Sequence, residues 1–210
     1  IETDRDILNI RSKKINLNLK LSLSEEEYGF SILKNFGVKK SDKIICIIAR
    51  DEVYLNKADP GMNWDYHNYR NSEIKNYKLA AEELANRGYF VFRMGSNNKE
   101  KFISNNKRVI DYSFSKYRSD FMDIFLSSKC NFAISNSLGL DGVFALFHKP
   151  IAFVNMVPLA YLQSYYQRYI FLFKKHFSSE KNRYLSINEI FDLGLASSLN
   201  TEDFEKKRIK

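Results

Sequence analysis

Four short apolar runs, rich in β-branched residues, alternate with amphipathic stretches along this chain. A strand that is apolar over nearly its whole length is buried on both faces, as in a parallel sheet covered by helices. The alternation is the signature of βαβ units. We therefore predict an α/β fold, a Rossmann-like three-layer domain with a mostly parallel sheet. The expected strands are residues 43–49, 89–94, 131–135 and 151–154.

The amphipathic stretches predict helices with recognisable start and stop signals. Gly37 can close a helix over 25–36 in the left-handed conformation, and Asn71 and Ser72 offer an N-cap for a helix through Arg87. Other helices are expected at 121–129, 140–147 and 161–173, and Thr201 is expected to cap a terminal helix.

The 210 residues fit one large domain with flanking segments. We expect residues 1–40 to be an N-terminal segment, linker or remnant of a preceding domain. Residues 41–200 should form the Rossmann-like, ligand-binding domain, and 201–210 a C-terminal helix or tail. Because the chain begins at Ile1 rather than Met, we expect a piece of a longer protein, so that half of an active site could be absent.

Cysteine usage and hydropathy point to a protein of a reducing compartment. Cys46 and Cys130 lie in or beside apolar runs, and two cysteines make neither a disulfide framework nor a zinc site. No apolar stretch approaches the roughly 20 residues that span a bilayer. The expected location is the cytoplasm, with the inner face of the membrane as an option.

The net charge of +8 calls for an anionic partner. The basic residues are scattered, whereas nucleic-acid binders more often concentrate them on one face. We therefore expect no nucleic acid. A nucleotide, an acidic glycan or a membrane surface would each suit the charge.

In an open parallel sheet, ligands bind outside the carboxyl ends of the strands. Arg50-Asp51 follows the first expected strand, and Arg93 precedes Gly95 at the end of the second. An arginine beside an apolar run requires an anionic partner, and its guanidinium matches phosphate oxygens. The partner is either a phosphate or carboxylate ligand or a carboxylate of the protein itself.

The third strand end carries the densest group of small polar residues. Glycine allows a close backbone approach and a helix start favours an anion, so we predict ligand contact; an ordinary N-cap is the alternative. The pattern is neither a phosphate-binding P-loop nor a dinucleotide fingerprint. The expected contacts are Ser135, Ser137, Gly139, Leu140, Asp141 and Gly142.

A long aromatic segment, residues 64–72, follows the first strand. Loops this long inside α/β domains are often functional, although an aromatic cluster packed over the sheet edge is an equal alternative. His67 could act as a base or donate to a phosphate, with a pKa near neutrality. The other candidates here are Tyr66, Asn68 and Arg70.

Arg118 and Ser119 precede another expected helix, which they would cap, and they could also meet the ligand. The three histidines are dispersed, so we expect no metal and no cofactor beyond the substrate.

These motifs together resemble a bacterial family of glycosyltransferases found in surface-polysaccharide gene neighbourhoods. The resemblance covers roughly residues 44–158. It rests on Arg50-Asp51, Trp64-x-Tyr66-His67-Asn68-Tyr69-Arg70-Asn71-Ser72, Gly88-Tyr89-x-Val91-x-Arg93-Met94-Gly95, Lys116-Tyr117-Arg118-Ser119-Asp120-Phe121-Met122-Asp123 and Ser137-x-Gly139-Leu140-Asp141-Gly142, followed by Lys149-Pro150-Ile151.

The resemblance implies the carboxyl-terminal, donor-binding half of a GT-B type glycosyltransferase. The serine and glycine turn, followed by Ala145 and Pro150, is similar to the donor site of heptosyltransferase-like enzymes. Arg50-Asp51 is similar to the strand-end motif with which fucosyltransferases neutralise a β-phosphate. The sequence departs from that motif at Ala49, where a histidine is often found, and in having one arginine instead of two.

The implied activity is transfer of a sugar from a nucleotide-sugar donor to a glycan or lipid-linked acceptor without a metal, with peripheral membrane contact as an option. Arg50 and Arg93 would neutralise the departing diphosphate. Asp141 would fix a hydroxyl, and Tyr66 and His67 would orient phosphate or sugar. His67 and Asp51 are the candidate bases within the chain. The alternative is a noncatalytic anion- or glycan-binding module or a partner-dependent subunit.

Overall fold

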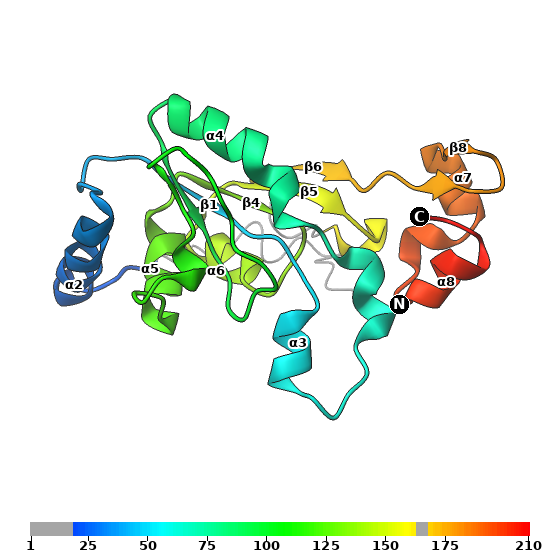
Figure 1. Cartoon of the computed structure of the whole chain (residues 1–210), viewed down its shortest axis with the longest axis horizontal. Coiled ribbons are helices and arrows are strands. Elements are labelled where there is room, and N and C mark those ends of the chain that lie inside the picture. The colour runs from blue at the N-terminus through cyan, green and yellow to red at the C-terminus, as the bar shows by residue number, and fades with distance from the viewer. Residues whose placement is uncertain (1–18, 163–167) are drawn as a thin grey trace.

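The computed structural model describes residues 19–162 and 168–210, and its centre is a parallel sheet (Figure 1). The six strands follow the order β3-β2-β1-β4-β5-β6, and every neighbouring pair is parallel. The predicted α/β, Rossmann-like fold is therefore confirmed. The strands are β1 (Ile44–Ile47), β2 (Phe90–Arg93), β3 (Val109–Ile110), β4 (Phe132–Ser135), β5 (Ile151–Met156) and β6 (Tyr169–Phe173).

Helices cover both faces of the sheet. This arrangement buries β1, whose side chains are apolar on both of its sides. Ile44 and Cys46 belong to the core beneath α2 (Leu23–Leu33), α5 (Asp120–Lys129) and α6 (Asp141–Leu146). Ile45 and Ile47 belong to a second core with Ala81 and Ala85 of α4 (Lys78–Asn86). Figure 1 shows α4 on one side of the sheet and α5 and α6 on the other. The strand order turns back between β1 and β4, which is where such sheets form a ligand crevice.

The helix predicted to begin at Asn71 and Ser72 starts later than expected. Residues Asp65–Arg70 form a 3₁₀ helix, η2, and Ile74–Tyr77 form another, η3, before α4 begins. Asn71 cannot cap α4 because its amide binds Arg50, Glu52 and Asn68. By contrast, Gly37 closes the turn after α2 with φ 76°, as predicted.

The predicted helix over 161–173 is wrong for its second half. Tyr169–Phe173 is the edge strand β6, which pairs in parallel with β5. The run Tyr-Ile-Phe-Leu-Phe consists of aromatic, aliphatic and β-branched residues, which suit a strand. The expectation for 163–167 and for the first 18 residues lies outside the described residues.

The C-terminal region packs beside the sheet as a small subassembly. It contains the ribbon of β7 (Phe177–Ser178) and β8 (Arg183–Tyr184), followed by α7 (Ile187–Asp192) and α8 (Thr201–Lys206). Asn200, not Thr201, caps α8 through its side chain. Thr201 Oγ1 instead lies 2.9 Å from the carbonyl oxygen of Asp65 and 3.0 Å from that of Tyr66. The ring of Phe204 stacks on that of Tyr69, with 5.0 Å between the ring centroids, so α8 packs against the aromatic segment.

Candidate functional site

The candidate site at the carboxyl ends of β1 and β4, which we call the crevice, is built around one buried asparagine. Asn136, which is 1% exposed, follows β4, and its Oδ1 accepts a hydrogen bond from the backbone N–H of Arg50 (2.9 Å). Its Nδ2 donates to the carbonyl oxygen of Arg70 (3.0 Å). The Arg70 guanidinium in turn donates to the carbonyl oxygen of Ser137 (2.7 Å). The strand end, the aromatic segment and the serine-glycine turn are thereby brought together.

Arg50 and Arg70 carry positive charge into this crevice. Arg50 Nη1 donates to the carbonyl oxygen of His67 (3.3 Å) and to Asn71 Oδ1. The Arg70 guanidinium lies 4.8 Å from the ring centre of Tyr161. Burial lowers the pKa of Arg50, and electrostatic repulsion from the positive charge of Arg70 lowers it further.

Among the described residues, neither Arg50 nor Arg70 forms an ion pair. The acidic groups nearest in sequence are already engaged. Asp51 accepts from the backbone N–H groups of Val53 and Lys99, both at 2.9 Å. Glu52 pairs with the Lys99 ammonium at 2.7 Å. Within the described part of the chain, two neighbouring guanidinium groups are therefore left without a directly paired carboxylate.

The other two candidate arginines have carboxylate partners within the fold. Arg93 is 1% exposed, and its Nη1 lies 3.3 Å from Asp111 Oδ1 and 2.5 Å from Ser113 Oγ. Arg118 pairs with Asp123 at 2.7 Å and with Asp120 at 2.8 Å. The sequence left open whether a strand-end arginine pairs with a carboxylate of the protein or with a ligand. Arg93 pairs with a carboxylate of the protein, whereas Arg50 has no ion pair among the described residues.

The serine-glycine turn is shaped from inside by Asp141. This residue has 0% exposure, and its Oδ2 accepts from the Leu138 N–H at 2.6 Å. Burial raises the pKa of Asp141 to about 6, against the opposing effects of the Ser135 hydroxyl, the Leu138 amide and the Arg70 charge. Ser135 Oγ and Asp141 Oδ1 are both buried, and neither has a hydrogen-bond partner of normal geometry among the described residues. The Asp141 carboxylate faces the turn rather than solvent.

The outer surface of the same turn is open. A Cβ added at Gly139 or Gly142 would meet no atom within 4 Å, and neither glycine has a positive φ. The non-glycine residue Ser137 instead adopts the left-handed region, with φ 72°. Leu140 immediately precedes α6 and is half-buried. Gly95, with φ 120°, lies at the end of β2.

His67 belongs to a cluster of three aromatic rings with Trp64 and Tyr66. Its ring is nearly parallel to that of Trp64 (6.2 Å between centroids, 7°) and lies 4.0 Å from that of Tyr66. Burial lowers its pKa to about 4, with further contributions from the charges of Arg70 and Arg50. The imidazole is therefore neutral at neutral pH, in contrast to the near-neutral pKa expected from sequence. Its Nδ1 is buried without a partner among the described residues.

Of the remaining candidates, Asn68 lies in the aromatic segment beside the crevice, whereas Arg118 and Ser119 lie elsewhere in the fold. Asn68 lies in the aromatic segment, where it bridges Asp65 (3.0 Å) and Asn71 (3.0 Å). Ser119 caps α5 by accepting from the Met122 N–H (3.2 Å), as the capping interpretation predicts. The described contacts of Ser119 and Arg118 thus run within their own segment rather than to the crevice.

Three polar residues of the site were not among the predicted site residues. Asn71 and Asn136 bind the arginines directly. Lys174 donates to the carbonyl oxygens of Tyr69 (2.7 Å) and Asn71 (3.1 Å), so the end of β6 holds the aromatic segment in place. Asn136 directly follows β4 inside the serine-glycine turn, whereas Asn71 follows the 3₁₀ helix η2, and the sequence offered Asn71 only as a helix cap.

No metal-binding cluster of three or more His, Cys, Asp or Glu residues occurs in the part of the chain that the structure describes. Within the same residues, no helix combines the length and the apolar character needed to cross a bilayer.

No protein-family model and no curated protein matches the sequence. Among solved structures, the chain is similar to a glycosyl transferase of family 9 from Veillonella parvula, with a TM-score of 0.51 and 14% identity over 74% of this chain and 42% of that one. It also matches the Escherichia coli ADP-heptose lipopolysaccharide heptosyltransferase II, with a TM-score of 0.48 and 12% identity over 90% of this chain and 51% of that one. The chain thus spans about half the length of these structures or less, and the first likeness establishes a shared fold.

Proposed function

We propose that this chain is the donor-binding part of a glycosyltransferase that moves a sugar from a nucleotide-sugar to a glycan or lipid-linked acceptor without a metal. The observation that carries the proposal is the pair Arg50 and Arg70 at the crevice, whose guanidinium groups have no ion-pair partner among the described residues. A nucleotide diphosphate supplies the missing negative charge.

In such a reaction the diphosphate leaves the sugar, and its developing charge must be stabilised where it forms. Arg50 and Arg70 present planar donor groups suited to phosphate oxygens. Their backbones are fixed to each other through Asn136, so little reorganisation is needed. Arg93 contributes less directly in this scheme, because its guanidinium already pairs with Asp111.

The turn gives the donor a second surface. Gly139 and Gly142 leave open space above the backbone, where a phosphate or ribose could approach closely. Asp141, which the sequence suggests as a hydroxyl ligand, acts in this scheme from inside by holding Leu138. Tyr66, which is 37% exposed, and neutral His67 line the side formed by the aromatic segment.

In this proposal the acceptor site and the catalytic base lie outside the crevice, in a part of the protein that faces it. Asp51 has both carboxylate oxygens occupied by backbone amides, and the low pKa of His67 makes it a weak base. The family 9 structure is more than twice as long as the region that this chain matches. A facing domain in a GT-B arrangement would supply the base and the acceptor site, at the cytoplasmic face of a membrane if the acceptor is lipid-linked.

Calorimetric titration with UDP-, GDP-, ADP- and CMP-sugars tests the proposal. A donor site should select one base and retain binding at moderate salt, because the contacts are partly buried. Equal and weak binding of every polyanion, lost as salt rises, would instead support a noncatalytic anion-binding module. In the full-length protein, sugar transfer and donor affinity that are both unchanged by Arg50→Ala would refute the assignment of Arg50.

A further inference from the structure

A concave surface lies beside β6, at one edge of the sheet. It is a cleft of about 580 Å³ between the carboxyl end of β6 and the β7–β8 ribbon. This volume falls in the range of small-molecule sites, roughly 300–1,000 Å³. Leu172, Tyr184 and three lysines, Lys174, Lys175 and Lys210, are among its lining residues.

The cleft continues into an exposed apolar stripe on β6. Ile170 is 73% exposed and Leu172 is 69% exposed. Residues two apart in a strand point to the same face, and Leu172 lines the cleft. The aliphatic stripe and the lysine-bearing cleft therefore form one continuous surface, which we call the β6 surface.

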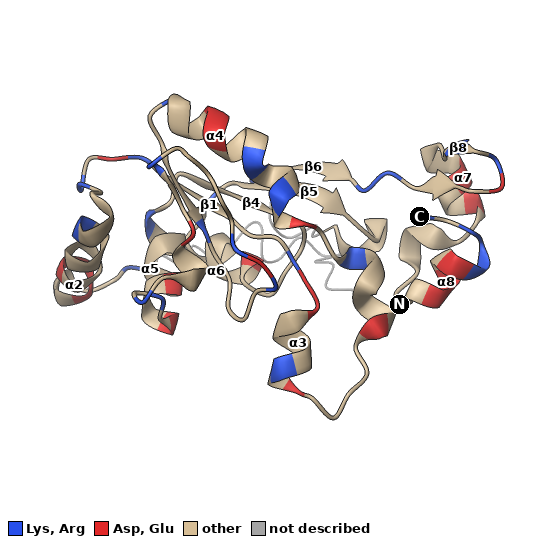
Figure 2. Ribbon diagram, viewed as in Figure 1, with Lys and Arg blue, Asp and Glu red and all other residues tan. Residues whose placement is uncertain are grey.

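The charge of the β6 surface is of one sign. Among the described residues that line the cleft, none is acidic. The connection from β6 to β7 carries Lys174 and Lys175, and its first part is blue in Figure 2. The Lys174 ammonium donates to the carbonyl oxygens of Tyr69 and Asn71. The Lys175 ammonium lies 5.3 Å from the ring centre of Tyr184, which is 57% exposed. An anion is thus the complementary partner.

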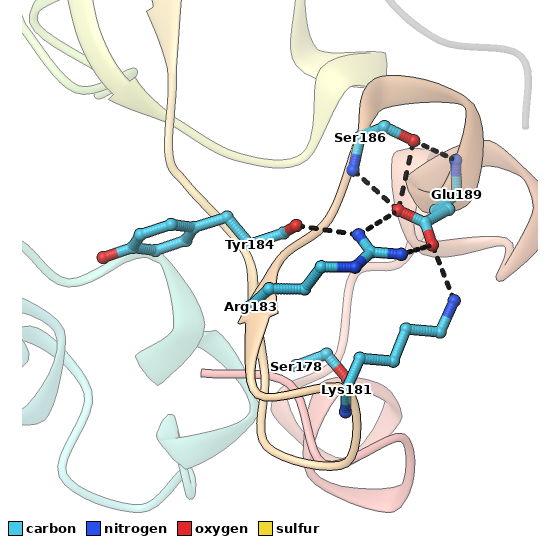
Figure 3. A network of polar contacts seen from close by, with 6 residues as sticks. All are labelled: Ser178, Lys181, Arg183, Tyr184, Ser186 and Glu189. Carbon is cyan, nitrogen blue, oxygen red and sulfur yellow. Dashed lines mark hydrogen bonds and ion pairs between the residues drawn. The ribbon is translucent and has the colours of Figure 1, made fainter.

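The ribbon that presents Tyr184 is held in place by an ion-pair network (Figure 3). Arg183 donates to both carboxylate oxygens of Glu189 (2.7 and 2.9 Å), and Lys181 donates to the same carboxylate (2.6 Å). Glu189 also accepts from the Ser186 N–H (2.9 Å), which anchors the network at the start of α7. Figure 3 shows the Tyr184 ring pointing away from this network. The network therefore holds the backbone of Tyr184, whose carbonyl oxygen accepts from Arg183 (3.0 Å).

We propose that the β6 surface docks on an anionic lipid surface, with a phosphate headgroup in the cleft and Ile170 and Leu172 entering the headgroup–acyl boundary. Exposed aliphatic side chains combined with tyrosine and lysine are the composition of membrane-interface segments. Lysine is depleted in the interfaces between proteins, so a partner protein or a second copy fits this surface less well. The inference extends the lipid-linked part of the proposed function.

Cosedimentation of the protein with vesicles tests the proposal, without any nucleotide-sugar present. Binding is expected with phosphatidylcholine vesicles that contain phosphatidylglycerol and not with phosphatidylcholine alone. The double variant Ile170→Thr/Leu172→Thr places β-branched side chains, which suit a strand, at both positions and should lower the partition coefficient at least about tenfold. Lys175→Gln should lower it about fivefold.

Matched variants elsewhere control for surface polarity and charge. Leu23→Gln/Leu79→Gln removes two side chains that are 82% and 83% exposed, and Lys57→Gln removes one charge on α3 (Val53–Ala58); binding should be unchanged in both. Circular dichroism confirms that each variant is folded.

Absence of binding to anionic vesicles, equal binding to neutral ones, or equal losses in the test and control variants would overturn the proposal. A β6 double variant that abolishes self-association while retaining vesicle binding would instead assign the surface to a second copy. Because no donor is present, failure here leaves the donor-site proposal standing, and failure of donor binding leaves this result unaffected.

Discussion

Replacing Asn136 by alanine should destabilise the protein and separate the two arginines. The substitution removes two hydrogen bonds, from the Arg50 N–H at 2.9 Å and to the Arg70 carbonyl oxygen at 3.0 Å. Each buried backbone group left without a partner costs about 1–3 kcal/mol. Because the Arg70 side of the site is only partly buried, water can replace that bond in part. We therefore expect a loss of about 2–4 kcal/mol in the free energy of unfolding.

Urea denaturation, followed by circular dichroism, measures this loss, provided that the slope against urea stays unchanged. Asn35→Ala is the control, because Asn35 is an exposed asparagine whose Nδ2 donates to the Ile32 carbonyl oxygen at 3.0 Å. It should change stability by no more than about 0.5 kcal/mol. A loss at Asn136 as small as that of the control would refute the idea that this side chain joins the strand end to the aromatic segment.

Three further substitutions or titrations probe other parts of the structure. In Gly29→Ala, the new Cβ would lie 2.3 Å from the buried ring of Phe125, so urea denaturation should show a loss of about 1–3 kcal/mol; unchanged stability would contradict the packing of α2 on α5. Gly139→Ala meets no neighbour within 4 Å, so stability should hold while calorimetry shows weaker donor binding; unchanged affinity would place the donor away from this turn. The pKa of His67 is about 4, below the value of about 6.5 in an unfolded chain, so its contribution to stability is present above pH 6.5 and is lost as the pH falls toward 4. Pyrophosphate bound at Arg50 and Arg70 should raise that pKa in a proton NMR titration, and an unshifted pKa at saturation would count against the shared site.

The sheet was predictable because its signal is local. The apolar runs that form β1, β2, β4 and β5 are bounded by polar residues and helix signals, and each is found where the pattern indicates. The edge strand β6 was assigned to a helix, because a short apolar run alone does not distinguish a strand from a buried helix. The run forms a strand because it pairs in parallel with β5, a contact distant in the sequence.

The candidate site was predictable only in part, because its chemistry depends on partners far away in the chain. Arg50 and Arg93 follow or end neighbouring strands, and sequence offers the same two alternatives for both. The fold brings Asp111 to Arg93 and gives Arg50 the amide of Asn71. The Tyr69 N–H donates a hydrogen bond to Thr201 Oγ1, which lies 132 positions away in the chain. The sequence carries no local signal for such a contact.

The central claim is that Arg50 and Arg70 bind a diphosphate, because no carboxylate in the described ranges pairs with either guanidinium group. The most direct test is the calorimetric affinity of the selected nucleoside diphosphate for Arg50→Met, Arg70→Met and Arg118→Met. Loss of one charged hydrogen bond costs about 1.5–3 kcal/mol, so the first two variants should bind roughly ten- to a hundredfold more weakly. Arg118→Met, which removes an arginine already paired with Asp123, should bind as the parent does. Equal affinity in all three variants and the parent would contradict the account.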